Sequence, residues 1–286
     1  MKTRTIGGRD VSAIGLGAMP MSVEGRPERE QSIRTIHAAL DAGVTLVDTA
    51  DAYHARADGL GHNEDVVAEA LRTWGGDSSS VLVATKGGHV RPDDGSWALD
   101  GTPEHLKRAA QDSARRLGVD AIGLYQFHRP DPEVPFAESV GALADLLDAG
   151  TIAMAGVSNA DPEQIRTAQD VLGGRLASVQ NQFSPSFRSS ERELRLCDEL
   201  GVAFMPWSPL GGISNAADLG TTAAAFAEVG EQLGVSPQRV ALAWQLAKSP
   251  CVVPIPGSSR PETIQDSAHA VDVRLSADQM ARLDAA

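Results

Sequence analysis

The candidate chemistry of this sequence begins where the apolar run Val44–Val47 ends on the carboxylate of Asp48. Tyr53, one of two tyrosines in the chain, follows five residues after that aspartate. The run has the length and β-branched content of a buried strand, so both polar groups are expected at the carboxyl end of a sheet, where α/β proteins build their sites. Taken alone, Asp48 also has a structural interpretation, because an aspartate after a strand often caps the next turn.

An amine and an imidazole, Lys86 and His128, follow the next two predicted strands along the chain. A single lysine there is usually a solvated charge, and a single histidine is often a structural hydrogen-bonding group. Beside a phenol they predict a proton relay, because an ammonium favours the phenolate and lowers the phenol pKa from about 10. We therefore interpret Tyr53 as the general acid toward a carbonyl and Lys86 as the group that tunes it. Asp48 is the expected ion-pair partner of Lys86, and His128 is the expected donor that orients the carbonyl.

Short apolar runs alternate with amphipathic segments along the chain, which is the pattern of an α/β protein. The predicted strands are Ile14–Ala18, Leu46–Asp48, Val81–Thr85, Ile122–Phe127, Ile152–Ser158, Ala177–Gln180, Ala203–Trp207 and Cys251–Ile255. The predicted helices are Gln31–Ala42, Asn63–Trp74, Pro103–Leu117, Phe136–Ala149, Pro162–Leu172, Ser190–Leu200, Thr222–Lys248 with a break at Gly234–Pro237, and Ala277–Leu283. A Gly-rich turn at Gly7–Asp10 predicts an N-terminal β-hairpin. The pattern therefore predicts a (β/α)8 TIM barrel made by one domain, residues 1–286.

An open doubly wound sheet is the alternative architecture, because Gly15–Gly17 could begin a dinucleotide-binding fingerprint. The third glycine of that fingerprint is missing, and Pro20 would interrupt the start of the helix that it requires. Asp48 also lies about thirty residues further on, whereas the ribose-binding acid is expected after ~20. We therefore favour the barrel.

The composition limits the partners and the cellular compartment. The formal net charge of −13 disfavours nucleic acid and an anionic membrane surface as partners, since both need clustered lysine and arginine. No apolar run of 18 residues is present, so no spanning helix is expected. The two cysteines, Cys197 and Cys251, give neither a disulfide framework nor a zinc set. Because no apolar segment follows Met1–Thr5, no secretory signal is predicted and a cytoplasmic location is expected.

Seven short stretches, each placed after its own predicted strand, are similar in residues and order to the aldo-keto reductases. They are Leu46–Tyr53, Ala84–Gly88, His128–Asp131, Gly156–Asn159, Val179–Asn181, Trp207–Leu210 and Ile255–Ser258. The sequence resembles this family along nearly its full length. The His-Arg-Pro-Asp form of the third stretch resembles the bacterial-type branch.

The resemblance implies an oxidoreductase that reduces an aldehyde or ketone by hydride transfer from NADPH, and no side chain could supply that hydride. The implied catalytic tetrad consists of Asp48, Tyr53, Lys86 and His128. The implied cofactor contacts are Ser158, Asn159, Gln180, Trp207, Ser208, Pro209, Leu210, Gly257, Ser258, Arg260 and Asp266.

Each part of the cofactor has its implied partners. Three side chains would hold the carboxamide: Ser158, Asn159 and Gln180. Trp207 would stack on the nicotinamide ring, where the family commonly has tyrosine, and the turn Ser208–Leu210 would follow the pyrophosphate.

At the other end of the cofactor, Gly257, Ser258 and Arg260 would take the adenosine 2′-phosphate, for which a guanidinium is well suited. Asp266 would lie near the adenine, followed by Ser267 where the family usually has asparagine. These residues predict NADPH in preference to NADH.

Other classes of function remain as alternatives. One is an NADPH-sensing regulatory subunit with little turnover, since some barrels of this family serve as regulatory subunits. Another is a lyase in which Lys86 forms a Schiff base. A metal-dependent hydrolase is disfavoured, because His54, His62 and His89 lack the spacing of a metal site and are interpreted as loop or surface residues.

The sequence predicts a small-molecule carbonyl substrate without identifying it, because the loops after the barrel strands select the substrate. Those loops are Met19–Pro27, His54–His62, His89–Asp100, Arg129–Pro135, Phe183–Arg188 and Gly211–Gly220. Trp97 and Phe183 are candidates for its apolar walls or for local packing. Asp93 and Asp94 are expected to be solvated. The sequence does not determine the oligomeric state.

Overall fold

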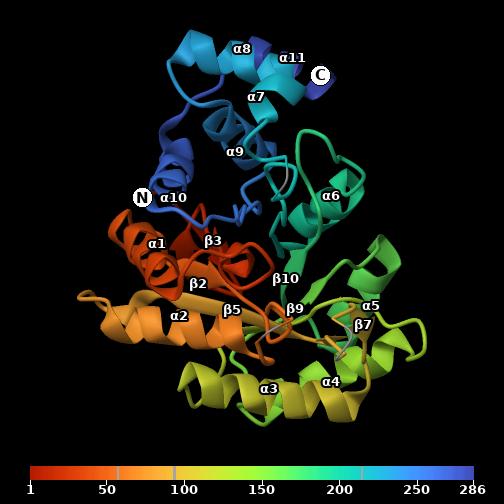
Figure 1. Cartoon of the computed structure of the whole chain (residues 1–286). Helices are drawn as coiled ribbons and strands as arrows, with labels where there is room; N and C mark the ends of the chain where they lie inside the picture. The colour runs from red at the N-terminus through yellow and green to blue at the C-terminus, as the bar shows by residue number, and fades with distance from the viewer. Residues whose placement is uncertain (57, 93–94, 214) are drawn as a thin grey trace.

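The fold is built on a curled parallel sheet, as seen in a computed structural model that describes residues 1–56, 58–92, 95–213 and 215–286 (Figure 1). Seven strands follow one another in the order β11-β10-β9-β8-β5-β4-β3. Their bounds are β3 (Leu16–Gly17), β4 (Leu46–Asp48), β5 (Leu82–Gly87), β8 (Leu124–Phe127), β9 (Ala155–Ser158), β10 (Leu176–Gln180) and β11 (Ala203–Phe204). The predicted parallel α/β architecture is therefore confirmed.

The segment 251–257, which contains the predicted eighth strand, connects the two edges of this sheet. Isolated parallel bridges join Phe204 to Val252 on one side and Gly17 to Gly257 on the other. Two prolines within the segment cannot donate ladder hydrogen bonds, so it forms bridges in place of a regular strand. The barrel is thus closed, although the prediction of a regular strand here is wrong.

Helices follow the strands and cover the outside of the sheet (Figure 1). The α-helices are α1 (Arg29–Asp41), α2 (His62–Thr73), α3 (Pro103–Leu117), α4 (Phe136–Asp148), α5 (Pro162–Val171), α6 (Glu191–Leu200), α7 (Leu219–Thr222), α8 (Ala224–Leu233), α9 (Pro237–Lys248), α10 (Pro261–Ala268) and α11 (Ala277–Ala285). Short 3-10 helices lie at Met19–Met21, Ser78–Ser80 and His269–Asp272. Every predicted helix is present within a few residues, whereas α7 and α10 were not predicted.

The N-terminal hairpin is also present, with β1 (Thr3–Ile6) antiparallel to β2 (Arg9–Ser12). Ile6 and Val11 from this hairpin belong to the same buried cluster as Leu46 and Leu82 of the barrel strands. The hairpin therefore packs against the barrel interior and leaves the carboxyl ends of the strands for the site.

A second, unpredicted hairpin follows β5 and pairs β6 (His89–Val90) with β7 (Ala98–Leu99). The chain leaves β5 through Gly88 at φ 104°, a conformation that glycine adopts readily. Asp93 and Asp94 lie outside the described residues, so their expected solvation is not tested. Within the described ranges, no helix has the length and apolar content needed to cross a bilayer.

Candidate active site

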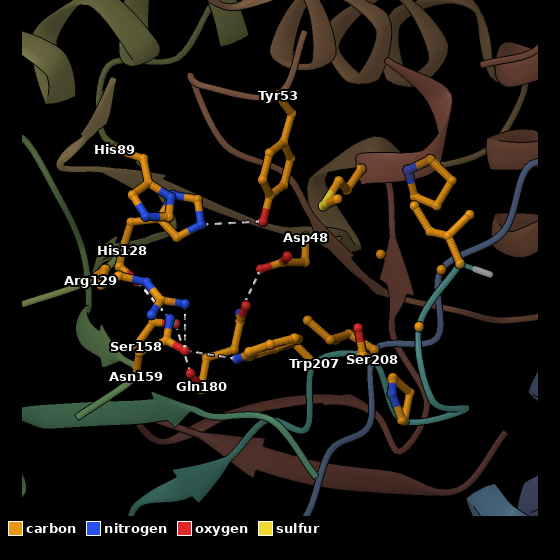
Figure 2. A pocket seen from close by; sticks show the side chains of 18 of the residues that line it. Asp48, Tyr53, His89, His128, Arg129, Ser158, Asn159, Gln180, Trp207 and Ser208 are labelled. Carbon is orange, nitrogen blue, oxygen red and sulfur yellow. Dashed lines mark hydrogen bonds between the residues drawn. The ribbon is translucent and has the colours of Figure 1, made fainter. Parts of the chain in front are cut away.

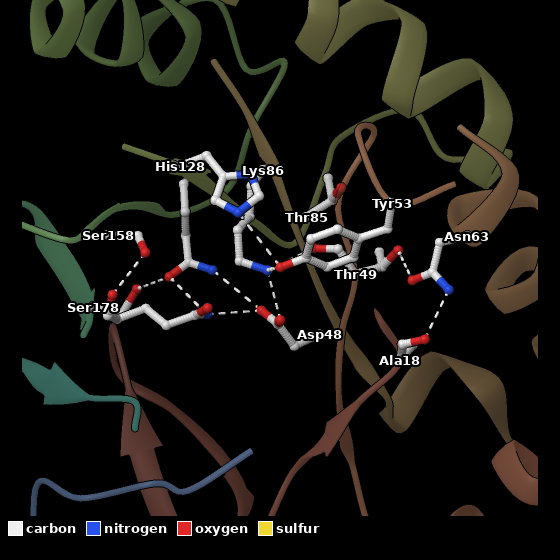
Figure 3. Close-up of polar contacts among 12 residues, drawn as sticks. Ala18, Asp48, Thr49, Tyr53, Asn63, Thr85, Lys86, His128, Ser158 and Ser178 are labelled. Carbon is white, nitrogen blue, oxygen red and sulfur yellow. Dashed lines mark hydrogen bonds and ion pairs between the residues drawn. The ribbon is translucent and has the colours of Figure 1, made fainter. Parts of the chain in front are cut away.

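The amine of Lys86 lies at the centre of the site and donates three hydrogen bonds (Figure 3). Its acceptors are Asp48 Oδ1 at 2.6 Å, the carbonyl oxygen of Thr49 at 2.9 Å and Tyr53 Oη at 3.1 Å. The side chain of Lys86 is completely buried and that of Asp48 is 4% exposed. All three donors of an ammonium are therefore satisfied inside the barrel.

The positions of these groups follow from the register of the strands. Asp48, the last residue of β4, pairs with Ala84 of β5, and Lys86 lies two residues further along β5. Because alternate residues of a strand share a face, Lys86 points to the same side as Ala84 and reaches the aspartate. The prediction that Lys86 follows its strand is wrong by two residues, since β5 continues to Gly87.

The second carboxylate oxygen of Asp48 is also held by donors. Gln180 Nε2 donates to Asp48 Oδ2 at 2.8 Å, and Gln126 Nε2 lies 3.4 Å from the same oxygen. Ser178 Oγ in turn donates to Gln126 Oε1 at 3.2 Å. These contacts fix the carboxylate on both sides, and Gln126 is a supporting residue that the sequence analysis did not identify.

Tyr53 comes from the loop after β4 and meets His128 across the site. Tyr53 Oη lies 3.5 Å from His128 Nε2, and the two rings are edge to face with centroids 5.5 Å apart. Burial raises the pKa of the phenol above its usual value, and the nearby ammonium of Lys86 offsets this only in part. The lysine acts in the predicted direction, but the expectation of a lowered phenol pKa is wrong in this structure because burial outweighs it.

Lys86 is charged in this environment. Burial alone would lower the pKa of its amine, but the adjacent Asp48 carboxylate and Tyr53 raise it above the ordinary lysine value. A Schiff-base nucleophile must be a neutral amine with a free lone pair. The geometry and charge of Lys86 therefore argue against the lyase alternative.

His128 follows β8 and is neutral. Burial, with help from the charge of Lys86, holds the pKa of its imidazole well below the usual value. Its ring lies against that of His89, with centroids 4.1 Å apart. His89 is half-buried on β6 and its own pKa is lowered to about 4, mainly by burial. The interpretation of His89 as a loop or surface residue is therefore wrong, because it contacts the site.

These groups open onto a cavity of about 530 Å³ (Figure 2). Its lining includes Asp48, Tyr53, His89, Trp97, His128, Arg129, Ser158, Asn159, Gln180, Trp207, Ser208, Pro209, Leu210, Ile213 and Gly257. Three of the four proposed catalytic residues lie on its wall, and Lys86 lies behind them. Among the described residues, no cluster of histidine, cysteine and acidic side chains suits a metal ion.

The side chains expected to hold a carboxamide lie together on one wall of this cavity. Ser158 Oγ donates to the carbonyl oxygen of Gln180 at 2.7 Å. Asn159 Nδ2 donates to Ser158 Oγ at 3.0 Å and to the carbonyl oxygen of His128 at 3.0 Å. Asn159 Oδ1 accepts from Trp207 Nε1 at 3.2 Å, so the asparagine ties the histidine to the expected ring-stacking residue.

Two non-glycine residues in the described part of the chain have positive φ, and both line this cavity. They are Asn159 at φ 57° and Ser208 at φ 49°. Such left-handed backbone is unfavourable for residues with a Cβ and is often found at functional sites. Ser208 begins the turn with Pro209 and Leu210 that was predicted to follow the pyrophosphate, and all three residues line the cavity.

The predicted phosphate-binding residues lie at and beyond the edge of the cavity. Gly257 lines it, whereas the buried Ser258 hydroxyl bonds within its own turn to Thr263 and to the carbonyl oxygen of Arg260. Arg260 is exposed at the start of α10. Asp266 accepts from Ser236 Oγ at 2.5 Å, besides forming an ion pair with an arginine of α9. The carboxylate of Asp266 is thus already engaged by the protein.

The two candidate wall residues have different positions. Trp97 is 47% exposed and lines the cavity. Phe183 is fully buried and stacks on Trp244 with centroids 5.3 Å apart, so it belongs to the core. Trp97 alone is therefore available to a substrate.

The chain matches known proteins along its length. A model of the "Aldo/keto reductase family" matches residues 13–286. The uncharacterized oxidoreductase C215.11c of Schizosaccharomyces pombe is 33% identical over 286 residues, which cover 99% of this chain and 89% of that protein. The 6-dehydroglucose reductase of Novosphingobium aromaticivorans is 34% identical over 273 residues, which cover 92% of this chain and 88% of that protein.

The fold of the chain is also similar to that of a solved structure. An aldo/keto reductase from Klebsiella pneumoniae, crystallised with NADP and acetate, superimposes with a TM-score of 0.82. It is 28% identical, and the match covers 100% of this chain and 95% of the other.

Proposed function

Because this chain belongs to the aldo/keto reductase family, we propose that it reduces the carbonyl group of an aldehyde or ketone to an alcohol with NADPH. The observation that carries the proposal is the position of Tyr53 Oη on the cavity wall, 3.1 Å from Lys86 Nζ and 3.5 Å from His128 Nε2. A phenol between an ammonium and an imidazole is suited to donate a proton to a carbonyl oxygen.

In the proposed mechanism, Tyr53 transfers its phenolic proton to the carbonyl oxygen as the alkoxide forms. The remaining phenolate is stabilised by the ammonium of Lys86, which Asp48 keeps charged and in place. His128 is neutral, so its Nε2 can donate a hydrogen bond to the same oxygen and orient the carbonyl. When bound, NADPH supplies the hydride for this step.

The residues of the cavity fit a nicotinamide cofactor. Gln180 Oε1 accepts no hydrogen bond from the described residues and can accept one from the carboxamide, next to Ser158 and Asn159. Trp207 offers an aromatic face to the nicotinamide ring. The left-handed backbone at Ser208 supports a role of the following turn in binding the pyrophosphate.

The residues predicted to bind the adenosine 2′-phosphate support a preference for NADPH over NADH. The exposed guanidinium of Arg260 is available to the 2′-phosphate, and Gly257 lets the backbone approach it closely. Ser258 and Asp266 are also proposed contacts, although their side chains already bond within the protein. The hydroxyl of Ser258 would have to leave its turn, and the carboxylate of Asp266 would act on the adenine while paired with Arg239.

The experiment that tests this function follows the loss of NADPH absorbance with the purified protein over a panel of aldehydes and ketones, and identifies the alcohol products. We expect stoichiometric alcohol formation and a lower KM for NADPH than for NADH. If NADPH binds in a direct titration but no carbonyl on the panel is reduced, the enzymatic proposal is contradicted and the regulatory-subunit alternative is favoured.

A further inference from the structure

The wall of the cavity carries one positive charge that has no ionic partner among the described residues. Arg129 follows His128 at the end of β8, is exposed, and lines the cavity. Its guanidinium donates to Asn159 Oδ1 at 3.3 Å, which is a neutral oxygen already accepting a hydrogen bond from Trp207. Its remaining donors are therefore available to a ligand.

The other charges of the site are balanced internally. Asp48 lines the cavity, but its carboxylate is neutralised by Lys86 at 2.6 Å. The imidazoles of His89 and His128 have lowered pKa values, to which burial contributes most and the charge of Arg129 also contributes. Since both rings are neutral, the guanidinium is the one uncompensated full charge on the described part of the cavity wall.

The position of Arg129 separates it from the phosphate groups of the proposed cofactor. Figure 2 shows Arg129 beside His89 and His128 and Ser208 toward the other side of the view, with Trp207 between them. The turn that begins at Ser208 is the proposed pyrophosphate site, so an anion at Arg129 belongs to the substrate.

We propose that Arg129 anchors an anionic group of the substrate, so that the preferred substrates are aldehydes or ketones that carry a carboxylate. This inference rests on the proposed carbonyl reduction. A guanidinium binds a carboxylate through two parallel hydrogen bonds, which fix its orientation as well as its position. Trp97, Leu99 and Ile213 line the same cavity and provide an apolar surface for the body of the substrate.

The test compares 3- and 4-carboxybenzaldehyde with their methyl esters, which keep the ring and the aldehyde but lack the charge. The wild-type protein is expected to show a kcat/KM about ten- to a hundredfold higher for at least one acid than for its ester. Arg129→Gln is expected to remove this preference, so that the ratio of kcat/KM for the acid to kcat/KM for its ester falls to about one, whatever change in ester turnover follows from losing the hydrogen bond to Asn159. Arg166→Gln, on the exposed face of α5, is the matched control and should retain the preference.

The salt dependence gives a second readout. Raising the ionic strength should increase KM for the acids and not for the esters in the wild-type protein, because salt screens an exposed charge. Arg129→Lys keeps the charge without the planar fork and should recover part of the preference.

A binding measurement separates failure of this inference from failure of the proposed function. Calorimetric titration of 3- and 4-carboxybenzyl alcohol into the NADP⁺-saturated protein needs no turnover, and Arg129→Gln should weaken binding about tenfold or more. Equal kcat/KM for acids and esters in the wild-type protein, or equal losses for both in Arg129→Gln, overturns the anion-anchor proposal. If no aldehyde is reduced at all, the reductase assignment fails, and the titration alone decides whether Arg129 binds a carboxylate.

Discussion

The two ends of the proposed cofactor site are built in different ways. At the catalytic end, Lys86 and Asp48 lie on neighbouring strands, are buried, and have their polar atoms held by protein partners. At the phosphate end, Gly257 and Arg260 are exposed: Gly257 ends the segment 251–257 that joins the two edges of the sheet, and Arg260 directly precedes α10.

The difference indicates what each end must do. A proton donor works only if its oxygen stays at a fixed distance from the ammonium and the carbonyl. Strand register fixes Asp48 and Lys86, and the amine of Lys86 in turn holds the hydroxyl of Tyr53, which comes from a loop. A phosphate contact requires only that a cation be available when the ligand arrives. Substitutions at the catalytic end should therefore change rate or stability, and those at the phosphate end should change cofactor choice.

The largest effect is expected for Tyr53→Phe, which removes the proton donor and keeps the ring. We expect kcat to fall by about 10²–10⁴-fold while the Kd for NADPH, measured by fluorescence titration, is unchanged. Tyr125→Phe is the matched control, because the hydroxyl of Tyr125 donates to the carbonyl oxygen of Leu106 in the core. Turnover near the wild-type rate in Tyr53→Phe would remove the tyrosine from the mechanism.

Lys86→Met should affect both rate and stability. It leaves the Asp48 carboxylate buried beside an apolar side chain, and breaking a buried ion pair in this way typically costs about 3–5 kcal/mol of unfolding free energy. Denaturant titration measures this loss. In the control Lys107→Met, the broken pair with Asp145 is largely exposed, so the loss should stay below about 1 kcal/mol. Equal losses in the two variants would mean that burial of Lys86 is not what stabilises the catalytic end.

Features that depend on local residue patterns could be predicted from the sequence, whereas features that depend on contacts between distant residues could not. The parallel strands and the placement of Asp48 follow from local apolar runs, which need no knowledge of distant contacts. His89 was missed because β6 has only two residues, too few to show a periodic pattern, and its packing on His128 joins distant parts of the chain.

Two other features of the site that the sequence did not reveal also depend on contacts between distant residues. The pairing of Asp266 with Arg239 joins α10 to α9, and no local pattern reveals such a partner. The direction of the Tyr53 pKa depends on how completely the loop is buried, which the residue types alone do not give.

A smaller effect is expected for Arg260→Ala. Loss of the exposed guanidinium should raise the Kd for NADPH about tenfold through the 2′-phosphate and leave the Kd for NADH and kcat unchanged. Arg274→Ala, another exposed arginine, is the control. A comparable loss of NADH affinity would show that Arg260 supports the fold of the segment and does not read the phosphate.

A change of pH is expected to have the smallest effect on kcat. Reduction requires the protonated phenol of Tyr53, which is lost only as pH rises through its pKa, and burial raises that pKa above about 10. The neutral form of His128 is lost only as pH falls through its pKa, which burial holds well below the usual value. Both required forms are therefore present throughout the range from about pH 6 to 9, and kcat at saturating substrates should be flat there.

The phosphate end should respond differently over the same range. A phosphate monoester has its second pKa near about 6, so the 2′-phosphate loses negative charge as pH falls through that value. The KM for NADPH should then rise toward pH 5.5 in the wild-type protein, while the KM for NADH should not, and Arg260→Ala should flatten the NADPH dependence. A bell-shaped kcat profile within this range would instead mean that burial does not dominate the pKa of the phenol, and that the catalytic end is as accessible to solvent as the phosphate end.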